Sequence, residues 1–505
     1  MNVNPITRLD YPDPDVIRVE DTYYMVSTTM HFMPGCEILQ SFDLVHWEHV
    51  TYVYETLDHT DAQQLKSGQN IYGQGMWAAS LRYHEGRFCI CFVANDTRKT
   101  YLYTSEKIDG PWKKQLIEGF YHDGSLLFDE DGRNYIVYGN DEIWITELNE
   151  DLTAPKKDGL HRLLVSDHKN PELGYEGSHI QKINGYYYIF LVHSLRDRWM
   201  RTEACFYSDS LEGEFTGGDV LCDDRGYCGQ GVAQGGIVDT PDGKWYAMLF
   251  QDSGAVGRIP ILLPVTWKDH FPFFGQNGHV PEEIEVHSTR PGYIYQPLVG
   301  SDDFCNGLLP RWQFNHDPDP RYYHLDALQG TYTITTREVC TELTQAVNTL
   351  TQRMSYPSCA AEVTVDASAL KEGDVAGLCA LQSCYAAVGI TKHHGKYEVL
   401  MLDKKEDGIL DMTEGTVVES HQMDFRLEAD FCNMKDEARC YYRVNKGDWL
   451  PIGTVHKLYF KLDHFTGCRF GLFCYAAEET GGSACFRDFK YYDVGSLRRK
   501  EETAD

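Results

Sequence analysis

Apolar and aromatic residues recur in a fivefold pattern along the first 300 residues of the chain. Five times a turn is followed by a strand-like run rich in aromatic side chains, and these segments read DTYYMVST from Asp21, EGRFCICF from Glu85, DGRNYIVYG from Asp131, NGYYYIFL from Asn184 and DGKWYAMLF from Asp242. Turns followed by such runs predict β-hairpins. The turn positions are 46 to 64 residues apart, and they are Thr22, Gly86, Gly132, Gly185 and Gly243. A period of this length predicts the blades of a β-propeller.

Each copy of the pattern has a landmark residue nine positions before its turn, and the five landmarks are Asp13, Trp77, Asp123, Glu176 and Gln234. The residues that follow a landmark are mostly small, as in Ala78-Ala79 and Gly235-Gly236. Small residues suit the innermost strands of a propeller, where bulky side chains would clash around the axis. We therefore predict an all-β, five-bladed β-propeller over residues 1–300, with the five landmarks at one end of its axis.

Three of the five landmarks are carboxylates. A single Asp-Gly or Glu-Gly pair is usually only a turn. Three carboxylates at one blade position share one small cavity, however, where like charges are unfavourable unless the chemistry uses them. Glycoside hydrolysis uses two carboxyl groups on opposite sides of a sugar, one as proton donor and one as base. Trp77 adds a face on which a sugar ring can stack. A calcium or magnesium site usually takes several oxygen ligands from one loop, and the sequence has no such loop.

The character of the chain changes near Ser301, where the blade pattern stops. New alternating runs follow without intervening helices, among them YHLDALQGTYTITT, KYEVLMLDKK and ARCYYRVNKG. Such runs predict a β-sandwich over residues 301–505.

Composition and charge exclude several classes of partner. The net charge is −30, so phosphate backbones and anionic lipid would be repelled, and we expect no nucleic-acid or membrane partner.

The first residues lack a basic start followed by an apolar run, and no stretch approaches the length of a membrane span, which favours a cytoplasmic protein. We interpret the 16 Cys as thiols rather than disulfides because several lie inside strand-like runs. The sequence leaves a homo-oligomer open.

Four segments carry a family resemblance: YPDPDVIRVEDTYYMVSTT, HDGSLLFDEDG, YEGSHIQKINGYYYIF and QGGIVDTPDGKWYAML. Over residues 1 to about 295 the chain resembles glycoside hydrolase family 43, whose members are five-bladed propellers with an Asp, Asp, Glu trio. The second half opens with DDFCNGLLPRWQFNHDPDPRYYHL, which resembles the start of the concanavalin A-like sandwich of family 43 β-xylosidases. The resemblance implies that a loop of the sandwich closes one side of the active site.

The resemblance also implies roles for the trio. Asp13 would be the general base, Asp123 the residue that orients and tunes the acid, and Glu176 the general acid. Family members invert the anomeric centre, so the Asp13 and Glu176 carboxyls should lie roughly 6.5 to 9.5 Å apart to leave room for water. No cofactor is required.

Three further positions follow from the resemblance. Arg258, in GRIPILLPVTW, matches a substrate-contacting Arg, and Phe32, in MHFMPG, matches an aromatic residue near the terminal sugar. Many relatives have a His where this chain has Gln234, and that His helps to hold a hydrated cation on the propeller axis. The departure argues against a structural calcium, and we count Gln234 among the substrate-binding residues.

The sequence thus predicts an exo-acting, inverting glycosidase that releases a terminal xylose or arabinofuranose from oligosaccharides of xylan and arabinoxylan. It does not decide between the two pentoses. The alternative from another functional class is a non-catalytic carbohydrate-binding protein that uses Trp77 and the sandwich. The three carboxylates favour the enzyme, because a binding protein gains nothing from crowding them.

Overall fold

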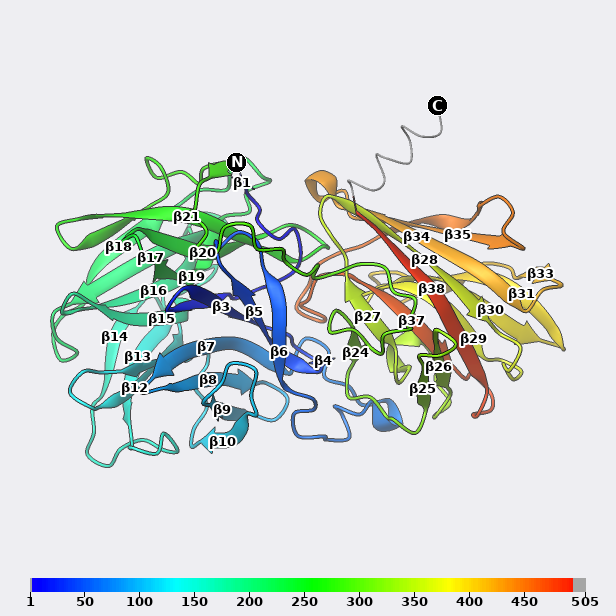
Figure 1. Ribbon diagram of the computed structural model, residues 1–505, viewed down its shortest axis with the longest axis horizontal. Helices are drawn as coiled ribbons and strands as arrows, with labels where there is room; N and C mark the ends of the chain where they lie inside the picture. The colour runs from blue at the N-terminus through cyan, green and yellow to red at the C-terminus, as the bar shows by residue number, and fades with distance from the viewer. Residues whose placement is uncertain (1, 494–505) are drawn as a thin grey trace.

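The strands expected from the alternating pattern account for almost the whole molecule (Figure 1). The structure is a computed structural model that describes residues 2–493. Within these residues helix is confined to three short 3-10 segments, Lys66–Gly68, Leu343–Gln345 and Cys432–Met434. The predicted all-β class, with a five-bladed propeller followed by a β-sandwich, is confirmed. None of the described helical segments is long and apolar enough to cross a membrane.

Each blade of the propeller is a four-stranded antiparallel sheet whose strands follow one another along the chain, except that the first blade omits β4 (Phe32–Met33). The first blade contains β2 (Asp15–Val19), β3 (Thr22–Ser27), β5 (Gly35–Ser41) and β6 (Glu48–Tyr54). The second contains β7 (Met76–His84), β8 (Arg87–Ala94), β9 (Lys99–Ser105) and β10 (Lys113–Ile117). The third contains β11 (Ser125–Phe128), β12 (Asn134–Asn140), β13 (Glu142–Leu148) and β14 (His161–Ser166). The fourth contains β15 (Glu176–Ile183), β16 (Tyr186–Ser194), β17 (Arg201–Ser208) and β18 (Thr216–Leu221). The fifth contains β19 (Val232–Asp239), β20 (Trp245–Asp252), β21 (Arg258–Lys268) and β22 (Phe271–Phe274).

Separate apolar clusters fill the gaps between neighbouring blades. The gap between the last blade and the first contains Val16 and Met25 from one side and Val238 and Met248 from the other. A two-stranded pairing of β1 (Asn2–Val3) with β23 (Glu283–Ile284) lies outside the five blades. Because burial of apolar area is the main favourable term in folding, these clusters hold the ring closed without exchanging a strand between blades.

Two antiparallel sheets form the sandwich. One has the order β32-β31-β30-β29-β37-β27-β24-β4, with β33 also pairing with β31. Its strands are β4 (Phe32–Met33), β24 (Gln313–Asn315), β27 (Leu350–Arg353), β29 (Val375–Leu381), β30 (Ala386–His393), β31 (Lys396–Lys404), β32 (Leu410–Met412), β33 (Thr416–Val418) and β37 (Arg469–Tyr475). The other has the order β25-β26-β38-β28-β34-β35-β36 and contains β25 (Tyr323–Asp326), β26 (Thr331–Thr335), β28 (Ser358–Asp366), β34 (Gln422–Asp430), β35 (Glu437–Val444), β36 (Leu450–Lys457) and β38 (Ser483–Asp493). The largest apolar cluster of the protein lies between these sheets.

The predicted domain limits are not tested at their outer ends, since residue 1 and residues 494–505 lie outside the described residues. The limit at residue 300 falls between β23 and β24 and stays a prediction.

All 16 Cys are free thiols, and most of them are buried.

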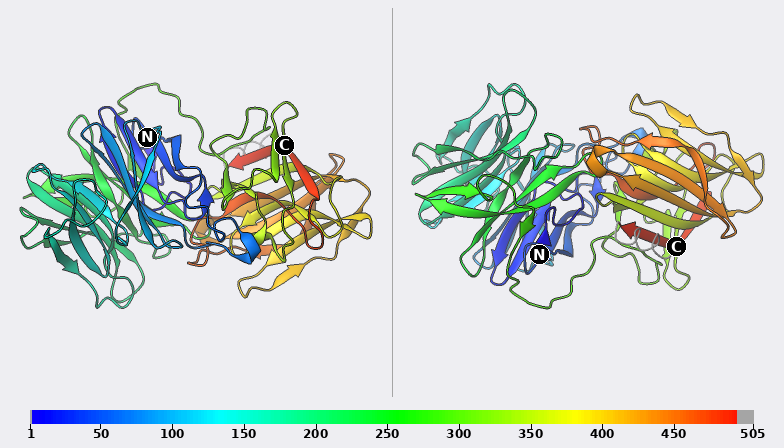
Figure 2. Two further views of the ribbon diagram at one scale, coloured as in Figure 1. Left: turned by 90° about the horizontal axis from the view of Figure 1, so that it is seen from below. Right: turned by 90° about the horizontal axis from the view of Figure 1, so that it is seen from above.

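The two domains share a sheet. Strand β4 leaves the first blade and pairs with β24, so the propeller contributes the edge strand of the nine-stranded sheet. A second junction forms where Asp10 accepts hydrogen bonds from the backbone N–H groups of Arg258 and Gly467, at 2.7 and 2.8 Å. A Cβ at Gly467 would lie 2.1 Å from the Val256 carbonyl oxygen, so only glycine permits this approach. Figure 2 shows the sandwich against one side of the propeller.

Three buried histidines from both domains meet at this interface and form what we call the histidine cluster: His31, His316 and His464, with Tyr72 beside them. The ring of His31 lies 4.8 Å from that of His316 and 5.0 Å from that of His464. Neither ring nitrogen of His31 or of His464 has a hydrogen-bond partner among the described residues. Burial lowers the pKa of His464 to about 3 and holds the pKa values of the other two well below 6.5.

We expect the histidine cluster to make the protein sensitive to acid. A histidine whose pKa is lower in the folded state than in the unfolded chain contributes stability above about pH 6.5, and this stability is lost as the pH falls. The positive charge of Arg469 adds to the cost of protonation, while Asp463 opposes it. We expect the free energy of unfolding to fall from pH 7 to pH 5, and His464→Phe to reduce this pH dependence. Chemical denaturation at several pH values measures it.

The control is His287→Gln, since His287 is exposed and lies outside the cluster. An identical pH dependence in the native protein and in His464→Phe would contradict the assignment.

Candidate active site

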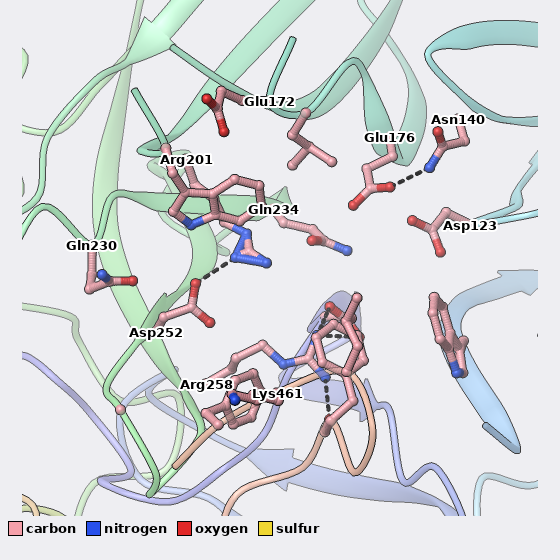
Figure 3. Close-up of a pocket in the computed structure, with 18 of the residues that line it drawn as sticks. Asp123, Asn140, Glu172, Glu176, Arg201, Gln230, Gln234, Asp252, Arg258 and Lys461 are labelled. Atoms are coloured by element: carbon pink, nitrogen blue, oxygen red, sulfur yellow. Dashed lines mark hydrogen bonds and ion pairs between the residues drawn. The ribbon is translucent and has the colours of Figure 1, made fainter. Parts of the chain in front are cut away.

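A pocket of about 640 Å³ opens where the landmarks of the propeller face a loop of the sandwich. Asp13, Asp123 and Glu176 line it together with Trp77 and Gln234. Figure 3 shows Asp123 and Glu176 on one side of the pocket and Arg201, Gln230 and Asp252 on the other, with Arg258 below. The structure therefore brings the five landmark positions together, as the repeat predicts.

Arg258 also lines the pocket, whereas Phe32 does not. The ring of Phe32 is 0% exposed, and the guanidinium carbon of Arg469 lies 3.5 Å from its centre. The expectation that Phe32 lies near a terminal sugar is thus not met. The physical reason is the pairing of β4 with β24, which takes this residue out of the first blade and into the domain interface.

Left-handed backbone conformations aim the landmarks at the axis. Asp13, Asp123 and Gln234 have φ angles of 52°, 47° and 65°, which non-glycine residues adopt rarely. In the fourth blade the left-handed residue is Gly177, with φ of 67°, and Glu176 lies one position before it. Bulges in β15 and β19 include Gly177 and Gln234 respectively. The left-handed residue therefore lies eight residues before the turn glycine in the fourth blade, and nine residues before the turn position in the blades of Asp13, Asp123 and Gln234.

Asp13 is buried and held by two donors. The Thr28 hydroxyl donates to Oδ2 at 2.6 Å, and Nη1 of Arg258 lies 3.1 Å from Oδ1. The hydrogen bond and the ion pair hold the Asp13 carboxylate in one orientation. The same guanidinium lies 4.3 Å from the ring centre of Phe465 and donates to the carbonyl oxygen of that residue, so a sandwich residue helps to position it.

Asp123 and Glu176 are linked through His122, which stands directly before Asp123 in the chain. Nε2 of His122 lies 3.6 Å from Oδ2 of Asp123 and 3.8 Å from Oε2 of Glu176. Asn140 donates to Glu176 at 2.7 Å, and the N–H of Gly177 donates to Asp123 at 3.0 Å. Burial, chiefly, raises the pKa of Asp123 to about 6, with the Glu176 and Asp13 charges adding and His122 opposing. The Asp123 charge raises the pKa of His122 to about 9.

The sandwich supplies one wall of the pocket, as the resemblance implied. Phe460, Lys461, Leu462 and Phe465 line it from the loop before β37. The ring of Phe465 lies 5.5 Å from that of Trp77. A wall contributed by the second domain shortens the cavity and shields the charges at its base from water.

His122, Asp123 and Glu176 also form the one group of three or more His, Cys, Asp or Glu within residues 2–493 whose ligand atoms all lie within 4.8 Å of one another. The group includes Asp123 and Glu176, to which the resemblance assigns the roles of tuning residue and general acid, so a cation bound there would compete with protons for the same oxygens. Gln234 is not part of it. The expectation of no calcium on the axis stays a prediction.

Several lining residues escaped the sequence analysis: His122, Asn140, Glu172, Trp199, Arg201, Gln230, Asp252, Phe460 and Phe465. His122 was detectable from its place next to a landmark. Most of the others lie outside the phase of the repeat, and their position depends on contacts between segments that are distant in sequence.

Comparison with known proteins identifies the family. The family model for glycosyl hydrolases family 43 matches residues 3–272, and that for the β-xylosidase C-terminal concanavalin A-like domain matches residues 301–492. The chain belongs to glycoside hydrolase family 43. It is therefore a glycoside hydrolase, and its second domain is the concanavalin A-like sandwich of that family.

Three relatives illustrate the similarity. A β-xylosidase of Formosa agariphila is 26% identical over 95% of this chain and 88% of its own length. A non-reducing end α-L-arabinofuranosidase of Bacteroides ovatus is 24% identical over 81% and 79%. Among solved structures, a bifunctional GH43-CE protein of Bacteroides eggerthii is 42% identical with a TM-score of 0.91. That comparison covers 97% of this chain, which spans only 64% of the bifunctional protein.

The link between His122 and Asp123 can be measured directly. The imidazolium charge opposes the rise in the pKa of Asp123, so His122→Asn should move that pKa further above 6. The carboxyl signal of Asp123 in a ¹³C NMR titration reports the change, and the acid limb of the pH–rate profile should move to higher pH with it. The matched control is His161→Asn, which lies on β14, outside the pocket. An Asp123 pKa that falls or stays in place in His122→Asn would contradict this arrangement.

Proposed function

We propose that the protein is an exo-acting, inverting glycosidase that releases a terminal xylose or arabinofuranose from xylan and arabinoxylan oligosaccharides. The observation that carries the proposal is the convergence of Asp13, Asp123 and Glu176 in one pocket that the sandwich closes on one side. A pocket with a wall of this kind accepts the end of a chain more readily than its middle.

The contacts of each carboxylate support its role. Asp13, fixed by Arg258 and Thr28, is suited to accept a proton from water. Glu176, hydrogen-bonded to Asn140 and close to Asp123 through His122, is suited to give a proton to the departing oxygen. Asp123 lies on the other side of His122 from Glu176, where it is suited to orient the acid. In a single displacement, water attacks the anomeric carbon on the Asp13 side while Glu176 protonates the leaving group.

The substrate class rests on chemistry and on relatives. A chain with a net charge of −30 suits a neutral sugar better than an anionic one. The named relatives include a β-xylosidase and an α-L-arabinofuranosidase, so both pentoses are part of the proposal. These roles require no cofactor.

The roles of acid and base separate when the leaving group is varied. An aryl pentoside expels a weakly basic phenolate that needs little protonation, whereas a disaccharide expels a basic alkoxide. Glu176→Gln should therefore lower kcat about 10²–10⁴-fold on the disaccharide and much less on the aryl substrate. Asp13→Asn should lower both by a similar factor, because water needs its base in either case. Steady-state kinetics with 4-nitrophenyl β-D-xyloside, 4-nitrophenyl α-L-arabinofuranoside, xylobiose and 1,5-arabinobiose test this.

The stereochemical outcome is read by ¹H NMR of the first sugar released. A product with the opposite anomeric configuration is expected. Retention of configuration, or equal losses on both kinds of substrate in Glu176→Gln, would overturn the assignment. Tyr83→Phe is a matched control, since Tyr83 lies on β7 but not in the pocket.

A further inference from the structure

One tryptophan at the rim of the pocket has no use in the trio's chemistry. Trp199 lines the pocket and is 44% exposed, on the loop between β16 and β17. Exposure of a large aromatic side chain is unfavourable in water, and exposed aromatics in a cavity are typical of binding sites. Trp77, the landmark aromatic, packs instead against Phe465 and His122 deeper in the site.

The end of β16, directly before the loop of Trp199, is braced against the segment that carries the proposed acid. The N–H of Leu173 donates to Oγ of Ser194 and the N–H of Ser194 donates to the carbonyl of Leu173, both at 3.0 Å. Glu176 follows three residues after Leu173, in the same blade. Because a general acid protonates the oxygen that joins the two sugars, the leaving group has to lie beside Glu176. The indole of Trp199 lies over Arg201, which faces Glu176 across the pocket (Figure 3). A leaving group beside Glu176 would therefore extend toward the indole.

A buried charge pair fixes the orientation of the indole before substrate binds. The guanidinium carbon of Arg201 lies 5.3 Å from the ring centre of Trp199, and the guanidinium is paired with Asp252. Arg201 is buried and extends into the pocket opposite Asp123 (Figure 3). A cation held over an aromatic face favours one ring position, so little entropy remains to be lost on binding.

The sandwich contributes a second exposed apolar side chain to the same pocket. Leu462 is 70% exposed, next to Lys461, on the loop that forms the wall. A sugar ring presents apolar C–H groups on its faces and hydroxyls at its edge. Two apolar rim residues from different domains suit the faces of such a ring, and the Arg201–Asp252 pair suits its hydroxyls.

We propose that Trp199 is the platform of a leaving-group subsite, on which the second sugar ring of a neutral oligosaccharide stacks. The inference rests on the proposed function for the direction of the chain, with the terminal sugar at Asp13 and the second sugar at Trp199. Arg201 is a positioning residue for the indole. The subsite makes the enzyme select for oligosaccharides over pentosides with a small leaving group.

The experiment compares substrates that have a second sugar with substrates that lack one. Trp199→Ala should lower kcat/KM about tenfold on xylobiose or 1,5-arabinobiose, the order expected for one aromatic contact. It should change kcat/KM on the matching pentosyl fluoride, whose leaving group is too small to reach the indole, by less than about twofold, and Trp199→Phe should restore most of the loss. Phe273→Ala is the matched control, because Phe273 is 49% exposed on β22 and lies outside the pocket.

A binding measurement keeps the inference separate from the catalytic proposal. In Glu176→Gln, calorimetry with xylotriose and with arabinotriose should show weaker binding when Trp199→Ala is added, while binding of free xylose or arabinose should not change. Failure of the native protein to cleave any pentoside overturns the proposed function, but loss of trisaccharide affinity in Trp199→Ala would still support the platform. Equal losses for monosaccharide and trisaccharide, or no loss for either, overturn the platform.

Discussion

Arg258 touches the propeller's proposed base and the sandwich's wall at the same time. Its guanidinium pairs with Asp13, lies against the ring of Phe465 and donates to the carbonyl of that residue. Its backbone N–H is bound by Asp10, whose other oxygen holds Gly467 of the sandwich. One buried residue therefore couples the position of the base, the position of the wall and the fit between the domains. Loss of its charge would leave a buried carboxylate unpaired, which is far costlier than loss of a surface ion pair.

Crowding of like charge is the second constraint on the site. Three carboxylates around one axis repel one another, and the structure offsets this with a cation for each side: Arg258 at Asp13 and His122 between the other two. At Asp123 the charge of His122 does not fully offset the cost of burial and of the neighbouring carboxylates. The pKa of Asp123 remains raised to about 6, chiefly because the carboxyl is buried. The left-handed backbone of Asp13 and Asp123 is a further cost of aiming them at the axis. A site with repulsion and strain of this kind is characteristic of catalysis rather than of simple binding.

The pocket wall depends on the domain interface behind it. His464 of the histidine cluster is the residue directly before Phe465, so the packing that keeps the histidines neutral also holds the wall. Strand β4 anchors the same interface from the propeller side, with Phe32 beneath Arg469. A change that opened this interface would move the wall without touching a carboxylate. The sandwich is thus part of the site and not only an appended domain.

The repeat in the sequence was enough to predict the fold class and the residues at the base of the site. The repeat predicts the number of blades and brings five landmarks to one end of the axis: Asp13, Trp77, Asp123, Glu176 and Gln234. It can do so because each copy of the repeat is a hairpin that positions its own innermost strand, so the signal is local in the sequence. In the fourth blade the left-handed residue is Gly177, one position after the landmark that the count of nine selects. The strand pairing reveals this bulge, and the count along the sequence does not. Tertiary structure alone decided that Phe32 joins the sandwich, that Phe465 supports Arg258, and that Trp199 reaches the rim. These placements arise from contacts between segments far apart in the chain, where no local period carries information about which side chains meet.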